Sequence, residues 1–243
     1  MSATESDDQS SGGQQPVAQR RPIRSYVVRS GRLTTSQGKA LAAHSAEYVI
    51  DYRPEPLDPA TVFGNPQSLV VEIGFGMGDS LLAMAADDPG RNYLGIEVHR
   101  PGIGKLLLGI TAQKLTNLRV INHDAKEVLA HCIGNGSLDG VQIFFPDPWH
   151  KKKHHKRRLI QPDFVQLLVS KLKAGGELHL ATDWQPYAEQ MLAVLEGNPQ
   201  LVNCAGPGQY ADPGRRPVTK FERRGRKLGH GVWDLRFSRS SAT

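Results

Sequence analysis

The chain has 243 residues, of which 39% are hydrophobic, enough for the core of one large α/β domain. Its longest apolar runs are far shorter than the ~18–20 residues that cross a bilayer, which excludes a membrane-spanning helix. Residues 20–32, 150–158 and 215–227 hold 18 of the 30 lysines and arginines but one acid, Glu222. Clustered cations repel one another unless a polyanion neutralises them, so these strips favour a nucleic-acid partner; the alternative is three separately solvated basic faces.

The first 66 residues show little hydrophobic periodicity. Residues 1–19 are rich in Ser, Gln, Gly and acids, without the apolar segment of a secretory signal, and predict a disordered tail. Residues 20–66 are rich in Arg, Pro and Gly and predict an extended basic arm. The two cysteines, Cys132 and Cys204, have no paired spacing, so each is expected to be a buried thiol of a cytoplasmic protein.

Strands and helices alternate along residues 67–243, which predict a single domain. Short apolar runs indicate buried parallel strands, and apolar residues at helical spacing indicate helices between them. The alternation, with short connections, predicts a doubly wound, mostly parallel α/β sheet. In chain order we expect strands at 69–73, 92–98, 118–121, 140–145 and 176–181, helices at 79–86 (capped by Asp79), 102–115, 124–130, 163–172 and 189–195, and a late strand at 232–237.

Acidic residues lie at or near the ends of four predicted strands: Glu72, Glu97, Asp124 and Asp147. Open α/β sheets bind ligands beyond the carboxyl ends of their strands, so these acids are expected around one site. Ordinary structural roles are the alternative. Glu72 would then be a surface acid, Glu97 an ion-pair partner and Asp124 a helix N-cap.

Gly74, Gly76 and Gly78 follow Glu72, and glycines let the backbone turn tightly and approach a ligand. The dinucleotide fingerprint needs a third glycine where this chain has Asp79, and the leading acid disfavours a pyrophosphate. A cationic or zwitterionic ligand fits better. Glu97 can accept hydrogen bonds from ribose hydroxyls, and Asp124 is within reach of an adenine amino group. These features resemble the Rossmann-like class I S-adenosylmethionine-dependent methyltransferases.

The predicted strand at 140–145 leads into Phe144-Phe145-Pro146-Asp147-Pro148-Trp149 and then His150-Lys151, directly before a run of cations. This string resembles the bacterial tRNA (guanine-N7)-methyltransferase family, and the likeness runs from about Arg24 to the C-terminus. Its other matching motifs are the Glu72 loop, Gly95-Ile96-Glu97, His154 to Arg158, Ala181-Thr182-Asp183-Trp184 and Thr219-Lys220-Phe221-Glu222.

The resemblance implies methyl transfer from S-adenosylmethionine to N7 of guanine 46 in the variable loop of tRNA. It implies that Asp147 is catalytic, and that the cofactor is contacted by Glu72, Gly74, Gly76, Glu97, Asp124 and Asp147. It further implies tRNA substrate contacts from Lys151, Asp183, Thr219, Lys220, Phe221 and Glu222, and RNA-backbone contacts from Lys153, His154, His155, Lys156, Arg157 and Arg158. No obligate protein partner is expected, and the protein would be a monomer or a homodimer.

Several assignments stay open. Trp149 stacks on the base or packs in the core; Asp183 accepts from guanine or caps a helix; Glu222 contacts a base or ribose, or forms a local ion pair. The histidines near Lys151 do not favour a metal, because the surrounding cations repel one. Competing functions are a methyltransferase for another RNA position, a non-catalytic RNA-binding module and, least favoured, a nicotinamide dehydrogenase.

Overall fold

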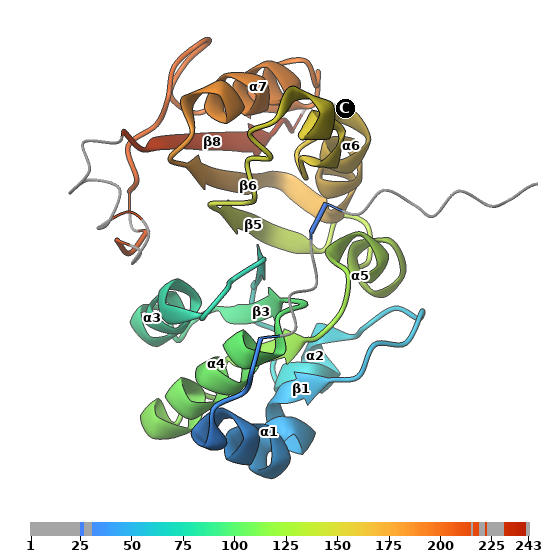
Figure 1. Cartoon of the computed structure of the whole chain (residues 1–243). Helices are drawn as coiled ribbons and strands as arrows, with labels where there is room; N and C mark the ends of the chain where they lie inside the picture. Colours follow the sequence, from blue (N-terminus) through green and yellow to red (C-terminus); the bar gives the residue numbers. More distant parts are fainter. Residues whose placement is uncertain (1–24, 27–30, 215, 219–221, 223–230, 242–243) are drawn as a thin grey trace, which may run out of the picture.

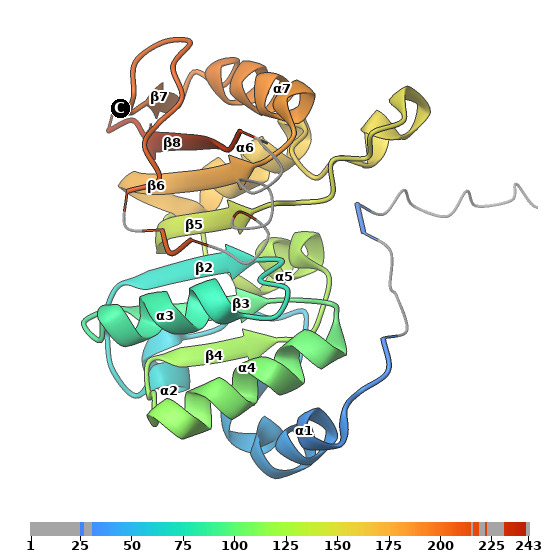
Figure 2. The same cartoon turned by 60° about the vertical axis from the view of Figure 1, so that its left-hand side comes forward.

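The structure is a computed structural model that describes residues 25–26, 31–214, 216–218, 222 and 231–241. Its strands form one sheet in the order β1-β4-β3-β2-β5-β6-β8-β7 (Figures 1 and 2). All neighbouring pairs from β1 to β6 are parallel, whereas β8 runs antiparallel to both β6 and β7. This confirms the doubly wound, mostly parallel sheet. The strands are β1 (Val49–Ile50), β2 (Leu69–Ile73), β3 (Asn92–Ile96), β4 (Leu118–Ile121), β5 (Leu138–Phe144), β6 (Leu172–Thr182), β7 (Leu201–Asn203) and β8 (Trp233–Arg239).

Helices cover the two faces of the sheet and enclose two apolar cores (Figures 1 and 2). One core joins one face of the sheet to α2, α5, α6 and α7, and the other joins the opposite face to α1, α3 and α4. The helices are α1 (Thr35–Tyr48), α2 (Pro59–Phe63), α3 (Asp79–Asp87), α4 (Arg100–Gln113), α5 (Ala125–Cys132), α6 (Pro162–Lys171) and α7 (Gln185–Glu196), with a 3₁₀ turn η1 (Lys152–Arg157).

The strand β2 contributes side chains alternately to the two cores. Leu69, Val71 and Ile73 face the first core, and Val70 faces the second. Glu72 shares the face of Val70, since side chains alternate along a strand. All of β2 is buried, so Glu72 places a carboxyl group in the interior of the domain.

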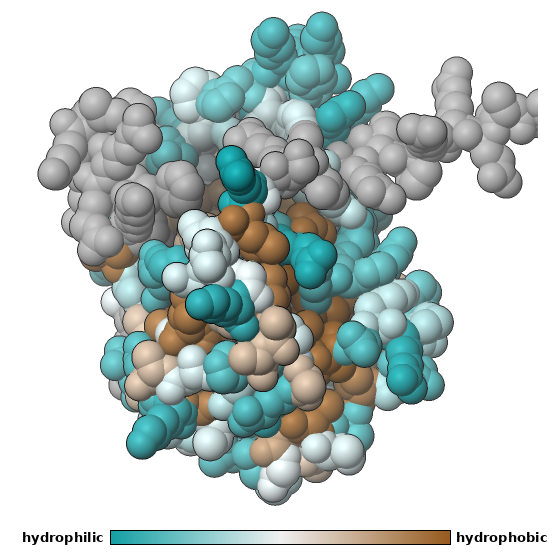
Figure 3. Space-filling model, turned by 60° about the horizontal axis from the view of Figure 1, so that its bottom comes forward, coloured by the Kyte–Doolittle hydropathy of each residue, from teal (hydrophilic) through white to brown (hydrophobic). Residues whose placement is uncertain are grey.

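Regular structure begins at Thr35, so the expectation of an extended basic arm is wrong for residues 35–63, which form α1, β1 and α2. Thr34 and Gln37 form a capping box that starts α1, and β1 pairs with β4 at the sheet edge. The capping-box spacing was visible in the sequence, but α1 has only a weak apolar stripe. Seen from the side of α1 and α4, hydrophilic side chains are interspersed with hydrophobic ones (Figure 3).

Two smaller expectations also need correction, and one strand was missed. Gly78 takes the N-cap position of α3 and Asp79 is its first residue, so Asp79 does not cap the helix. Cys132 is buried as expected, but Cys204 is exposed. The short strand β7 was not expected. No helix of the described residues has the length and apolar character needed to cross a bilayer.

Candidate functional site

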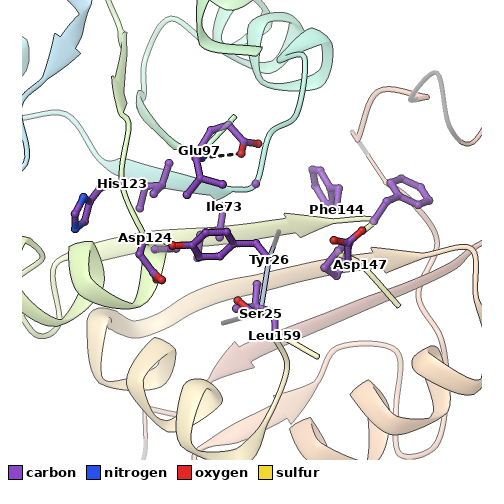
Figure 4. A pocket seen from close by; sticks show the side chains of 15 residues that line it. Ser25, Tyr26, Ile73, Glu97, His123, Asp124, Phe144, Asp147 and Leu159 are labelled. Carbon is purple, nitrogen blue, oxygen red and sulfur yellow. Dashed lines mark hydrogen bonds between the residues drawn. The ribbon is translucent and has the colours of Figure 1, made fainter. Parts of the chain in front are cut away.

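A cavity of about 240 Å³ opens at the carboxyl ends of the central strands, where the alternation of strand and helix predicted a ligand site (Figure 4). Its floor comes from β2 and β3, and its sides come from the chain that follows β4 and β5. Three of the four predicted strand-end acids line it: Glu97, Asp124 and Asp147. The remaining lining residues are Ser25, Tyr26, Ile73, Gly74, Ile96, Val98, His123, Ala125, Phe144, Phe145, Pro146 and Leu159.

The glycine loop after β2 bends around one end of the cavity. Gly74, Gly76 and Gly78 have φ values of +71°, +59° and +78°, a region that strains any residue with a Cβ. A Cβ built on Gly74 or Gly76 would meet no atom within 4 Å. The space beside these two glycines is therefore open, which suits a ligand in close contact with the backbone.

Glu97 fastens the loop to the end of β3. Its Oε1 accepts hydrogen bonds from the N–H groups of Val98 and His99 at 2.7 and 2.9 Å, and its Oε2 accepts one from Gly76 at 2.8 Å. A carboxylate oxygen offers about two acceptor positions. Oε2 can therefore accept one further donor, such as a ribose hydroxyl, without breaking a bond that the structure shows.

Glu72 lies behind the cavity and does not line it. Its side chain is buried, and its Oε2 has no hydrogen-bond partner among the described residues. Burial, reinforced by the nearby carboxylate of Glu97, raises the pKa of Glu72 to about 8. A buried acid without a partner is costly, and such groups concentrate at functional sites.

Asp124 caps a helix and also lies at the wall of the cavity. Its side chain accepts from the N–H of Lys126 at 2.8 Å and so caps α5, and it also lines the cavity. The preceding residue, His123, stacks on Tyr52 with ring centroids 3.6 Å apart. The cap and the stacked pair hold this side of the cavity in place.

Asp147 stands on the opposite side of the cavity, in the turn that follows β5. The turn starts at Phe145, whose φ is +52° and whose N–H donates to the carbonyl of Ala181 at 2.8 Å. Asp147 is exposed and lines the cavity, so it is accessible both to a bound ligand and to a molecule that approaches from solvent.

Trp149 makes contacts that the sequence did not suggest. Its indole N–H donates to the carbonyl of Ser25 at 3.1 Å, and the Arg157 guanidinium lies 5.0 Å from the centre of its ring. The neighbouring Tyr26 extends across the cavity from the Asp147 side toward Asp124 (Figure 4). The sequence gave no signal for Ser25 and Tyr26, because their approach depends on the path of the N-terminal chain.

The cations after Trp149 form the turn η1, the unlabelled yellow turn that projects beyond the carboxyl edge of the sheet in Figure 2. Lys151, Lys153, Lys156 and Arg157 are exposed, and His154 and His155 are half-buried. Partial desolvation, followed by the charges of the surrounding cations, lowers the pKa of His154.

Arg158 differs from its neighbours and does not fit the predicted RNA-binding strip. It is buried, it donates to the carbonyl of Pro148 at 2.8 Å, and it bonds the side chain of Gln190. Its guanidinium also lies 4.7 Å from the centre of the Tyr187 ring. These contacts fix the end of the cationic turn to α7 and leave Arg158 unavailable to phosphate in this conformation.

The predicted substrate residues divide into three groups. Asp183 is half-exposed just after β6; the residue in the cap position of α7 is Trp184, whose N–H donates to Thr182 and not to Asp183. Glu222 is fully buried and pairs with Arg216 at 2.6 Å, so the ion-pair alternative describes it. Thr219, Lys220 and Phe221 lie outside the described residues. Among described residues, no group of three or more His, Cys, Asp or Glu side chains is arranged to hold a metal ion.

Solved structures share this fold. The 16S rRNA methyltransferase KamB matches with a TM-score of 0.53 over 88% of this chain and 98% of its own, at 14% identity. At that identity the likeness shows the fold alone, and the fold with its carboxyl-edge cavity is that of class I methyltransferases. Residues 66–235 match the model of a family described as putative methyltransferases.

Curated relatives narrow the class. A tRNA (guanine-N(7)-)-methyltransferase from Paracidovorax citrulli is 55% identical over 92% of this chain and 89% of its own length. A protein of the same name from Shewanella denitrificans is 54% identical over 91% of this chain and 93% of its own. The chain belongs to the tRNA (guanine-N7)-methyltransferase family.

Proposed function

We propose that the protein transfers a methyl group from S-adenosylmethionine to N7 of guanine 46 in the variable loop of tRNA. The observation that carries this proposal is the position of Asp147, which lines the cavity across from Asp124 (Figure 4) and stands four residues before Lys151, the first cation of an exposed basic run. A carboxylate between a small-molecule cavity and an RNA-binding surface suits chemistry on a base. Membership of the family and a proposed cytoplasmic location, where tRNA is present, agree with it.

The residues around the cavity fit the cofactor. The open space at Gly74 and Gly76 suits close contact with a ligand, and the free acceptor position on Glu97 suits a ribose hydroxyl. The unpartnered, buried Glu72 favours a cationic ligand over an anionic one. When bound, the cofactor supplies an already activated methyl group on a sulfonium.

The protein's own task is then mainly positioning. Guanine N7 has a lone pair and no proton, so no residue needs to act as a general base. Methylation leaves positive charge on the guanine ring, and we propose that Asp147 stabilises this charge while it holds the N1–H and amino edge of the base. Lys151 and Asp183 are proposed to contact the same nucleotide, and the exposed cations of η1 the RNA backbone.

Labelled S-adenosylmethionine and tRNA transcripts test the proposal directly. Methyl transfer is expected to a transcript with guanine at position 46 and not to one with adenine there. Asp147→Ala should lower turnover by about 10²-fold or more, as loss of a charge-stabilising group does, with tRNA affinity within about twofold because phosphate contacts dominate affinity. Transfer to the adenine transcript would refute the assigned target base; normal turnover with weakened tRNA binding would refute the role of Asp147.

A further inference from the structure

No helix of the described residues covers β5, β6 and β8 on the face that looks toward α3. Residues 211–214 and 216–218 lie there instead, starting with an antiparallel bridge in which the N–H of Ala211 donates to the carbonyl of Asp234 at 2.8 Å. This irregular segment has no apolar stripe with which to bind the sheet. Between this segment and the sheet, charged side chains stand where an apolar layer would otherwise be expected.

Arg216 is the centre of this charged layer. Its Nε and Nη2 donate to the two carboxylate oxygens of Asp234 at 2.7 and 2.8 Å, and its Nη1 donates to Glu222 at 2.6 Å. The three side chains are 1%, 3% and 0% exposed, respectively. One arginine thus joins three segments of the chain in the interior: the segment after Ala211, the strand β8 and the residue Glu222.

The cluster extends into β6 through His179, whose Nε2 lies 2.7 Å from Oδ1 of Asp234. Burial favours a higher pKa for Asp234, but the hydrogen bonds from His179 and Arg216 outweigh it and lower that pKa. Burial likewise works against the charge of Arg216, and its bonds to Asp234 and Glu222 outweigh it and raise the pKa of Arg216. The ion pairs are therefore formed at neutral pH.

The cluster lies directly behind the turn that carries Asp147. The Arg216 guanidinium is 5.6 and 5.5 Å from the ring centres of Phe144 and Phe145, and the ring of His179 meets Phe144 edge-on at 5.1 Å. Phe144 and Phe145 also line the cavity. Their rings separate the charged cluster from the site, and Asp147 follows two residues later.

We propose that Arg216 is a positioning residue, which holds the Phe144–Asp147 turn from behind, and that Glu222 acts through Arg216 as an anchor. In this assignment Glu222 does not contact the target base, in contrast to the role implied by the family resemblance. Its carboxylate is fully buried and bonded to Arg216, and breaking that bond would leave a buried arginine short of a partner. The catalytic consequence rests on the proposed function, but the structural one does not.

Hydrogen–deuterium exchange on the free protein tests the structural part. Glu222→Gln keeps the side-chain volume and removes the charge, and it should speed exchange in peptides that cover Phe144 to Asp147. Arg236→Lys is the matched control, because Arg236 lies on β8, like Asp234, and pairs with a half-exposed carboxylate, Glu177, at 2.7 Å. It should leave that exchange unchanged. Unchanged exchange in Glu222→Gln overturns the proposal.

A double-mutant cycle on methyl transfer tests the catalytic part. Arg216→Lys keeps the positive charge and loses the guanidinium that bonds Asp234 and Glu222 at the same time. It should therefore lower kcat by about tenfold or more, as misplacement of a catalytic group does. The KM for tRNA should stay within about threefold of the wild-type value. Arg236→Lys should stay within about twofold of the wild type in both constants. Adding Glu222→Gln to Arg216→Lys should cause little further loss, because residues that act as a unit are not additive.

The outcomes separate the two proposals. Fully multiplicative losses would show that Glu222 acts independently of Arg216, and an unchanged kcat in Arg216→Lys would show that the Arg216 guanidinium does not position the turn; either result would overturn the inference. If Arg216→Lys does not fold, the exchange result for Glu222→Gln decides. Failure of the wild type to methylate tRNA would refute the proposed function instead, and the exchange experiment would still test the anchor.

Discussion

Two groups of buried acidic residues lie on the same face of the sheet. Glu72 and Glu97 form a group without a neutralising cation, called here the unbalanced group; Asp234 and Glu222 form the balanced group, whose charge Arg216 neutralises. Glu72 and Glu97 lie beside each other, and none of the ion pairs between described residues involves either. Asp234 and Glu222 share Arg216. Pairing places Glu72 beside Gln142, and Gln142 beside His179, so one row of the sheet leads from the unbalanced group to the balanced one.

The presence or absence of a neutralising arginine distinguishes a buried acid that stabilises the fold from one that can respond to a ligand. A buried acid with a well-placed arginine fixes the chain, because breaking the pair leaves an unpaired charge. A buried acid without a neighbouring cation stays protonated unless a positively charged ligand binds beside it and favours the ionised form. Each group contains two buried acids, and the second differs from the first in having the cation Arg216 between them.

The largest expected effect on stability comes from breaking the balanced group. Asp234→Ala removes the acceptor of two Arg216 hydrogen bonds and of His179. Removing one partner of a buried ion pair costs about 3–5 kcal/mol, which urea unfolding would measure. Glu177→Ala removes the half-exposed partner of Arg236 on the neighbouring strand and should cost about 0–1 kcal/mol. Equal losses in both variants would contradict the distinction.

Removing the ionisable group of Glu72 should stabilise the folded protein at high pH, whereas removing Asp234 should destabilise it. The pKa of folded Glu72 is raised from 4.5 to about 8, so the folded state keeps a proton that the unfolded state loses. This contribution to stability is fully present below pH ~4.5 and is lost as the pH rises to about 8. Glu72→Gln cannot ionise, so above pH ~8 it should be more stable than the wild type by a few kcal/mol.

Unfolding curves of the free protein at several pH values measure this effect. The wild type should lose stability between pH ~5 and ~8 relative to Glu72→Gln, with a limiting slope of about 1.4 kcal/mol per pH unit. Parallel pH dependence in the two proteins would show that Glu72 is ionised or solvated in the folded state.

The sequence predicted the unbalanced group better than the balanced one. Glu72 and Glu97 were recognisable because each lies at or near the end of a buried strand, and strand ends meet at one edge of a parallel sheet. The balanced group depends on pairings across the fold: His179 and Asp234 are 55 residues apart. No local pattern distinguishes Arg216 from the other cations of residues 215–227.

The same reasoning explains which elements were predicted. The buried strands β2 to β6 and helices such as α4 carry apolar residues in regular spacing, so their existence and order followed from the sequence. The helix α1 was not predicted because its apolar residues show little helical periodicity, and packing against α4 holds it in place. Arg158 was assigned to RNA because a run of cations does not show which side chain turns inward.

Binding of the cofactor should release protons from the unbalanced group. At pH 7 most folded Glu72 carries its proton, since its pKa is about 8. A cation bound nearby favours the carboxylate, so S-adenosylmethionine should displace up to about one proton per molecule. Isothermal titration calorimetry in two buffers of different ionisation enthalpy counts these protons. Glu72→Gln should release none; the same proton release in this variant would place the titrating group elsewhere.

The smallest effects concern cations that belong to neither group. Lys156 is exposed on η1, whereas Lys114 is exposed just before β4, at the opposite edge of the sheet from the cavity. If η1 binds the RNA backbone, Lys156→Gln should reduce the slope of log K against log salt for tRNA by about 1. Lys114→Gln should leave the slope unchanged. Equal slopes in all three proteins would remove η1 from the RNA-binding surface, whereas a reduced slope in Lys156→Gln alone would show that the exposed cations contact phosphate.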